Sequence, residues 1–276
     1  MKNKKQKALK KSTSTSVVVG LTVICTLMGR NSTQAQQVVN YEVPGSYGAT
    51  SYSGQGAYSD PGNNYWNTIP GSGGTTGGGF GDLLSDGATS TSITLSLSSY
   101  QTYNNGAQGA QGTPGGLMAP FILENNGTPV TGTFNNVPAG AYDLFLYGYN
   151  YPDGDRGTTF TASAGGVSDG SLSTVGLNVN AAGGTTVETA FTSGVDYVEF
   201  TGLDLTQVGN IDFTFAANTS IDRAAGLGDY SGVNHEGDFN GVQLVQIVPE
   251  PSTMTLAGLG GFCGLLIALR YRRLYN

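Results

Sequence analysis

Short segments in which apolar and polar residues alternate, separated by glycine-rich turns, fill the middle of this chain. Examples are Ser92–Ser98 and Ala141–Tyr149, and the 276 residues include 44 glycines. Alternation with a period of two is typical of a half-buried β-strand, while glycine and β-branched residues weaken helices. The same region shows no sustained apolar pattern at helical spacing. These features predict an all-β fold.

The expected strands are short and follow one another at nearly regular spacing, with turn sequences such as Pro138-Ala139-Gly140 between them. This arrangement predicts an antiparallel β-sandwich with a jelly-roll-like form. Residues 44–116 are less regular and rich in glycine, which fits either long loops or a flexible entry segment. The further expected strands are Val130–Phe134, Thr158–Ala162, Thr185–Thr192, Asp196–Thr201, Asn210–Ala216 and Val242–Ile247.

The N-terminus has a different composition from the middle. Six lysines between Lys2 and Lys11 precede the apolar stretch Val17–Met28. A basic region followed by a short apolar run is the layout of a secretory signal, and this run is shorter than the roughly 20 apolar residues of a membrane span. Small residues up to Ala35 offer a cleavage site for signal peptidase. We therefore interpret residues 1–35 as a signal peptide; an uncleaved anchor is the alternative, and it too would leave the following domain outside.

The charge of the chain is concentrated in its middle. Of 19 acidic residues only Glu250 lies outside residues 36–248, and of 12 basic residues only Arg156 and Arg223 lie inside, so this region has 18 acidic and 2 basic side chains and a formal charge of −16. Such a charge repels nucleic acid phosphates, so we exclude DNA or RNA as a partner. Both cysteines lie in the apolar ends, which excludes a disulfide or a thiolate metal site in the middle.

The C-terminus is a tail in three parts. The motif Val248-Pro249-Glu250-Pro251-Ser252 comes first, Met254–Leu269 follows without a charge, and Arg270, Arg272 and Arg273 form a basic end. The uncharged part predicts a single transmembrane helix, and basic flanks stay on the cytoplasmic side, so the domain between the two ends faces outward. This tail, the last 29 residues, resembles the PEP-CTERM sorting signal of Gram-negative bacteria.

The resemblance implies processing near the motif by an exosortase, a membrane transpeptidase, for which this chain is the substrate. It also implies a destination in the cell envelope or extracellular matrix, often in association with exopolysaccharide. An ordinary C-terminal anchor is the alternative. The expected organisation is a signal peptide (1–35), an exported acidic β-sandwich domain (36–247) and a sorting tail (248–276).

Two groups of residues in the middle are candidates for binding. Asp153 and Asp155, with Asp143 nearby, could join backbone carbonyls around a calcium ion, because hard cations prefer oxygen ligands. A turn with solvated carboxylates is the better interpretation, because Pro-Asp-Gly is a common turn sequence. Tyr65 and Trp66 could stack on a sugar ring, but packing of the only tryptophan in the core is the better interpretation. No other cofactor is expected.

No residue stands out as catalytic. His235 is the only histidine, and no Gly-x-Ser-x-Gly turn accompanies it, so a loop histidine is the better interpretation. Pairs of carboxylates could cleave glycosides, but the sequence selects no pair. We therefore expect a non-enzymatic surface or matrix protein, with a glycan-binding jelly-roll module as the first alternative and a carboxylate-dependent glycan hydrolase as the second.

Overall fold

The computed structural model describes residues 36–43, 52–69, 74–75, 82–98, 101–104, 114–124, 128–148, 157–174, 190–218 and 237–248. The chain divides into two compact units, Met1–Ala35 and Gln36–Asn276, and all described residues belong to the second. The predicted signal peptide and the sorting tail after Val248 lie outside the described residues. Within the described ranges, no helix has both the length and the apolar character needed to cross a membrane.

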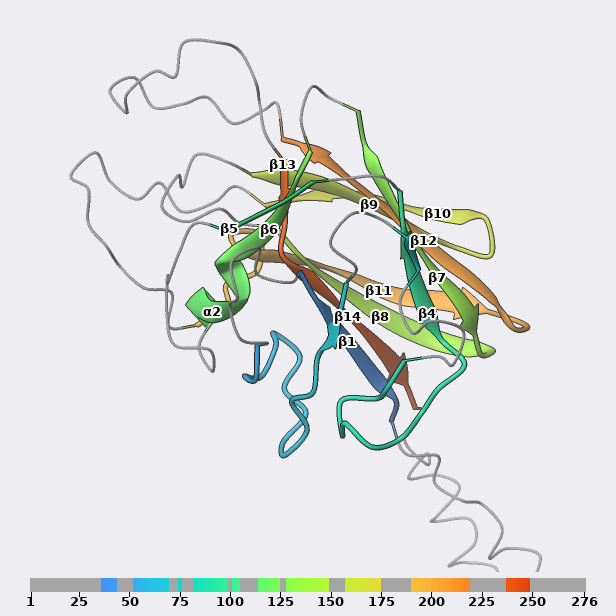
Figure 1. Ribbon diagram of the computed structural model, residues 1–276. Helices are drawn as coiled ribbons and strands as arrows, with labels where there is room; N and C mark the ends of the chain where they lie inside the picture. The colour runs from blue at the N-terminus through green and yellow to red at the C-terminus, as the bar shows by residue number, and fades with distance from the viewer. Residues whose placement is uncertain are drawn as a thin grey trace, which may run out of the picture. The chain divides into compact units, whose positions relative to one another are not determined.

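Two large sheets and one small sheet form the second unit (Figure 1). Sheet A has the order β11 (Tyr197–Leu205), β8 (Gly140–Tyr147), β14 (Gly241–Ile247), β1 (Val38–Glu42) and β2 (Asn67–Thr68). Sheet B has the order β10 (Val167–Ser173), β9 (Thr158–Ala164), β12 (Gly209–Ala217), β7 (Val130–Val137), β4 (Thr94–Leu97) and β3 (Gly74–Thr75). Sheet C consists of β13 (Gly237–Phe239), β6 (Pro120–Glu124) and β5 (Gln101–Asn104).

The strand pairs are antiparallel except for β1 and β2, which run parallel. The described helix α2 (Pro114–Met118) has only five residues. The prediction of an antiparallel all-β fold is therefore confirmed, while its jelly-roll form stays a prediction. The predicted strand Thr185–Thr192 is wrong in its described part, because Ala190–Thr192 is not a strand and the backbone N–H of Thr192 donates to Asp196 Oδ2 at 2.6 Å.

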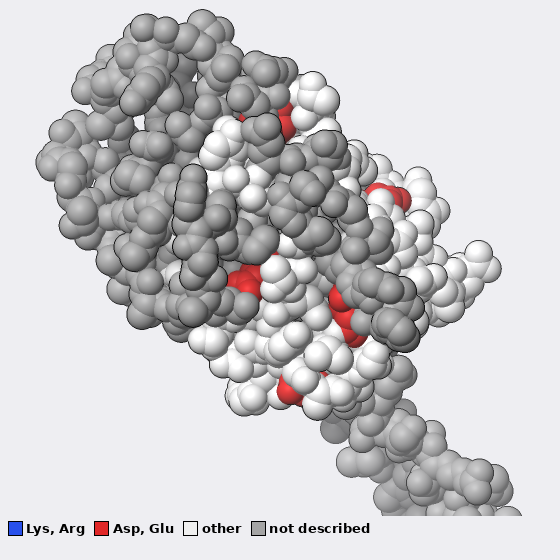
Figure 2. Space-filling model, in the orientation of Figure 1, with Lys and Arg blue, Asp and Glu red and all other residues white. Residues whose placement is uncertain are grey.

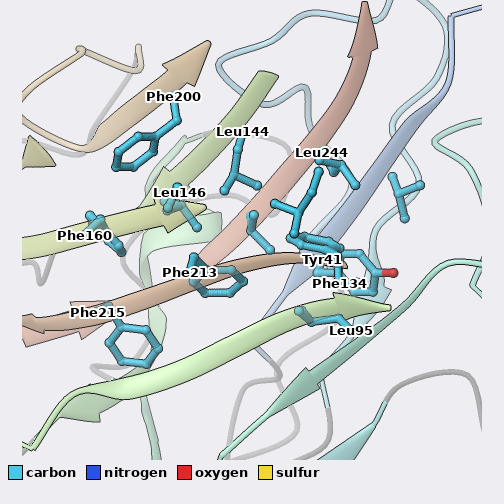
Figure 3. Close-up of a cluster of buried hydrophobic side chains, with 14 of the residues drawn as sticks. Tyr41, Leu95, Phe134, Leu144, Leu146, Phe160, Phe200, Phe213, Phe215 and Leu244 are labelled. Carbon is cyan, nitrogen blue, oxygen red and sulfur yellow. The ribbon is translucent and has the colours of Figure 1, made fainter. Parts of the chain in front are cut away.

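Side chains from the facing surfaces of sheets A and B form one apolar cluster (Figure 3). Leu144 and Leu146 from β8 lie on one side of the cluster, and Phe134 and Phe213 from β7 and β12 lie on the other. Tyr41 of β1 meets the ring of Phe134 edge-on, with 5.6 Å between the centroids. Burial of these side chains between two sheets is the main stabilising contribution to a sandwich of this kind.

The first and last strands of sheet A pair with each other. Val38 of β1 lies opposite Val245 of β14, and the backbone N–H of Gln246 donates to the Gln37 carbonyl oxygen at 2.8 Å. The described domain therefore begins and ends at the same end of sheet A. Because β14 ends at Ile247, the Pro-Glu-Pro motif follows the folded sheet with almost no linker.

Candidate functional site

The outer face of sheet A carries a second apolar cluster. Residues from β1, β8 and β14 contribute its sheet side, and the segment 52–66 and α2 pack over them. Trp66 lies at its centre, with its ring 5.2 Å from that of Tyr52 and 6.1 Å from that of Tyr147. Its buried members are Val38, Tyr52, Trp66, Leu117, Met118, Phe145, Tyr147 and Val245. A large part of this sheet face is thus covered by chain.

Gln243 of β14 holds the covering segment against the sheet. Its side-chain amide donates to Asn40 Oδ1 at 2.9 Å and to the Tyr58 carbonyl oxygen at 3.2 Å, while its Oε1 accepts from the Tyr58 backbone N–H at 3.1 Å and from the Tyr147 hydroxyl. A Cβ at Gly56 would lie 2.0 Å from Gln243 Oε1, so the segment can approach this closely only as glycine. The buried amide is fully engaged, as burial requires.

Next to the covered area lies a group of three aromatic rings and two carboxylates, which we call the sheet A patch: Tyr58, Asp143, Phe145, Tyr197 and Glu199. Phe145 is central, with its ring 6.1 Å from that of Tyr58 and 6.0 Å from that of Tyr197. Phe145 is 6% exposed, whereas Tyr58 and Tyr197 are only half-buried. The patch therefore presents two accessible phenol rings on either side of a mostly buried one.

The two carboxylates of the patch interact electrostatically. Burial raises the pKa of Glu199, and the charge of Asp143 raises it further. The pKa of Tyr58 is raised by burial first, then by the charges of Asp60 and Asp143. Asp143 is held in place because its Oδ1 accepts the backbone N–H of Gly202 at 3.0 Å, where β11 contains a bulge and Gly202 has a φ of +70°.

No basic side chain balances these carboxylates within the described ranges, which contain Asp and Glu but neither Lys, Arg nor His. Figure 2 shows acidic side chains in red among the described residues of the face in view. The described carboxylates of the patch therefore give it hydrogen-bond acceptors and a negative potential. Carboxylate oxygens accept hydrogen bonds from the hydroxyl groups of a ligand, and their negative charge repels an anionic ligand.

The structure separates Tyr65 from Trp66. Trp66 is 3% exposed and its indole N–H donates to the Gly54 carbonyl oxygen at 3.0 Å, so it packs in the second cluster, the interpretation that the sequence favours. Tyr65 is 40% exposed and remains accessible. Of the two residues, only Tyr65 is accessible for the predicted sugar contact, and that contact stays a prediction.

The predicted calcium ligands are only partly described. Asp143 lies in β8, whereas Asp153 and Asp155, like His235, lie outside the described residues. The described part of the chain contains no group of three or more His, Cys, Asp or Glu side chains arranged to hold a metal ion. The structure instead brings Asp143 next to Glu199, a residue that the sequence analysis did not select, and the calcium site stays a prediction.

Comparison with known families identifies the tail. Residues 248–273 match the PEP-CTERM protein-sorting motif. The chain thus carries a PEP-CTERM sorting tail, as the sequence predicted from Val248-Pro249-Glu250-Pro251-Ser252 and the arginines Arg270, Arg272 and Arg273. The motif indicates export, sorting at the membrane through the C-terminus, and processing by an exosortase.

Comparison with individual proteins gives no close relative. No curated protein matches the chain. Among solved structures, the CBM36-1 domain of a multidomain xylanase from the hindgut metagenome of Trinervitermes trinervoides is similar at 12% identity over 55% of this chain and 95% of that one, with a TM-score of 0.29. TmCBM61 in complex with β-1,4-galactotriose is similar at 11% identity over 55% of this chain and 83% of that one, with a TM-score of 0.25. TM-scores this low support no conclusion about a shared ligand.

Proposed function

We propose that this protein is a non-enzymatic surface or matrix protein that binds a polysaccharide through the sheet A patch. The observation that carries the proposal is the row of Tyr58, Phe145 and Tyr197 beside Asp143 and Glu199 on one outer sheet face. Sugar rings present C–H groups on their faces and hydroxyls at their edges. Aromatic rings bind the former and carboxylate oxygens accept hydrogen bonds from the latter.

The sorting tail of the protein supports this proposal. The sorting motif indicates an exosortase substrate, and we propose removal of residues 1–35 by signal peptidase and delivery of the acidic, jelly-roll-like domain to the cell envelope or matrix. The pairing of β1 with β14 is consistent with this route, because the start of the domain after residue 35 and its end before the sorting tail then lie at one end of sheet A. A polysaccharide ligand outside the cell would be an exopolysaccharide.

Glycan hydrolysis is the second candidate, and one observation favours it. Asp143 and Glu199 are close enough for the charge of one to raise the pKa of the other, and a carboxyl group with a raised pKa beside an ionised one is the pair that glycosidases use. The two candidates separate in an assay of reducing ends released from polysaccharide. Binding without release of reducing ends supports the non-enzymatic proposal, and release that Glu199→Gln abolishes supports hydrolysis.

The binding proposal is tested with the full chain in detergent and its Tyr197→Ala variant. We expect Tyr197→Ala to weaken retention by immobilised polysaccharide at least about tenfold, which corresponds to about 1.4 kcal/mol. Tyr103→Ala is the matched control, because Tyr103 is 39% exposed but lies in sheet C. Tyr65→Ala tests the separate sugar contact predicted from the sequence. Equal retention of wild type and Tyr197→Ala would contradict binding at the patch.

A further inference from the structure

We infer that the ligand of the sheet A patch is a single, electrically neutral polysaccharide chain. The inference rests on the proposed function and adds the chemical class of the ligand to it. Two observations carry it: the sign of the charge around the patch and the relative tilt of its rings. The patch thereby selects against uronate-containing and sulfated polymers and against crystalline surfaces.

The charge argument starts with the residues that a bound chain would meet. Glu199 lies opposite Phe145 in the strand pairing, and Asp143 lies two residues before Phe145 in β8. Asp60 is close enough to Tyr58 for its charge to raise the pKa of that phenol. A polymer on the accessible rings of Tyr58 and Tyr197 therefore lies near three carboxylates. Across the described ranges, every side chain that is charged at neutral pH is a carboxylate. An anionic polymer would bring like charges together with no basic side chain of the described ranges to compensate them, and such contacts oppose binding.

A bound cation could in principle bridge two anions, but the patch is poorly built for one. Within the part of the chain that the structure describes, no three His, Cys, Asp or Glu side chains converge on a common point. One oxygen of Asp143 already accepts the Gly202 N–H, and hard cations such as calcium require six to eight oxygen ligands. Hydroxyl groups of a neutral sugar match the available acceptors directly.

The ring argument concerns the shape of the ligand. The ring planes of Tyr58 and Phe145 differ by 49°, and those of Phe145 and Tyr197 differ by 39°. Phe145 is thus coplanar with neither flanking ring, so one planar crystal face cannot stack on Phe145 and on Tyr58 or Tyr197 at the same time. The three rings can follow a single chain whose successive sugar rings turn relative to one another.

The experiment uses matched soluble polymers that differ only in charge. Hydroxyethyl cellulose is compared with carboxymethyl cellulose, and dextran with dextran sulfate, by affinity electrophoresis of the full chain in detergent. Microcrystalline cellulose serves as the planar surface in a pull-down. Each measurement is made with calcium and with a chelator. We expect retention by at least one neutral soluble polymer, at least tenfold weaker retention by its charged partner in either condition, and no depletion by the crystalline surface.

The double variant Asp143→Asn and Glu199→Gln keeps acceptors at both positions and removes both charges. Because the variant removes the like charges that oppose the anionic polymer, we expect its ratio of neutral to charged retention to fall towards one, whereas wild type keeps a ratio of at least about ten. Equal retention of neutral and charged polymers by wild type, or charged binding that appears only with calcium, would overturn the neutral class while leaving binding at the patch intact. Depletion by microcrystalline cellulose would overturn the single-chain inference. Absence of any retention by a folded protein overturns the proposed function itself.

Discussion

The two outer faces of this sandwich are built in opposite ways. On sheet B, polar side chains from neighbouring strands bond to one another: Thr133 Oγ1 donates to the carboxylate oxygen Oδ1 of Asp212 at 2.7 Å, and the hydroxyls of Thr161 and Thr214 lie 2.6 Å apart. The outward positions of β7, β9 and β12 carry no aromatic ring. On sheet A, the outward positions carry rings, a buried amide and carboxylates, and a separate chain segment covers part of them.

This difference teaches where function can reside in such a fold. Sheet B satisfies its own polar groups, so its outer face needs nothing beyond solvent. Sheet A leaves aromatic rings and carboxylates at the border of its covering segment, where the half-buried rings of Tyr58 and Tyr197 remain accessible. A ligand gains most where rings and acceptors are fixed in advance but not fully covered.

The largest expected effect is on stability. Trp66→Ala on the sheet A side removes a buried indole and should lower the free energy of unfolding by about 3–5 kcal/mol. Thr161→Ala on the outer face of sheet B removes one partly buried hydroxyl pair and should cost no more than about 1 kcal/mol. Urea unfolding monitored by circular dichroism measures both. Similar losses for the two variants would show that the faces do not differ as described.

A smaller effect is expected at the amide that fastens the covering segment. Gln243→Ala leaves the buried side chain of Asn40 and the hydroxyl of Tyr147 without this partner and should cost about 1–3 kcal/mol. Hydrogen exchange should accelerate within residues 52–66. Asn135→Ala is the control, because Asn135 bonds to Ser96 on the outer face of sheet B. Unchanged exchange in 52–66 would mean that Gln243 does not hold the segment.

Glu199 gives a pH dependence of known sign. Because its pKa is raised in the folded state, the folded protein binds this proton more tightly than the unfolded chain does. Stability from this group is present below the ordinary glutamate pKa of 4.5 and is lost as the pH rises through the raised folded value. Relative to wild type, Glu199→Gln should therefore become more stable as the pH rises through this window. Thermal melts across this range test it, and parallel profiles contradict it.

The smallest expected effect is on the outer face of sheet B. Thr161→Val preserves the shape of the side chain and removes its hydrogen bond to Thr214, so we expect a change within about 0.5 kcal/mol. Polysaccharide retention should be identical to that of wild type. A loss of retention would place a ligand contact on sheet B and end the functional distinction between the faces.

Several of the strands that the sequence revealed have one covered and one solvated face, although β14 was also predicted and is buried at nearly every position. β9 and β12 alternate buried and less buried residues along their length, and this alternation is visible in the sequence. β1 is buried at every position because segment 52–66 covers its outer side, and β10 is exposed at nearly every position. The period-two pattern disappears in both cases, so neither strand was predicted.

The candidate site, like the strands, was predictable only where its residues are close together in the sequence. The sorting motif was predictable because all its parts are local in the chain, from Val248 to Arg273. The sheet A patch joins Tyr58, Phe145 and Tyr197 from distant parts of the chain. Pairing of β8 with β11 brings Phe145 and Tyr197 together, and packing of the segment 52–66 on the sheet adds Tyr58. Asp143 was selected with its neighbours in sequence, whereas its structural neighbour is Glu199. No local signal identifies that partner.

Retention of the full chain by a neutral soluble polysaccharide, compared between Tyr197→Ala and Thr161→Val, tests the central claim most directly. The two variants alter one outer face each. If the sheet A patch binds the polymer, Tyr197→Ala loses retention by about tenfold or more and Thr161→Val matches wild type. If retention is unchanged in Tyr197→Ala, or falls equally in both variants, the assignment of polysaccharide binding to sheet A is contradicted.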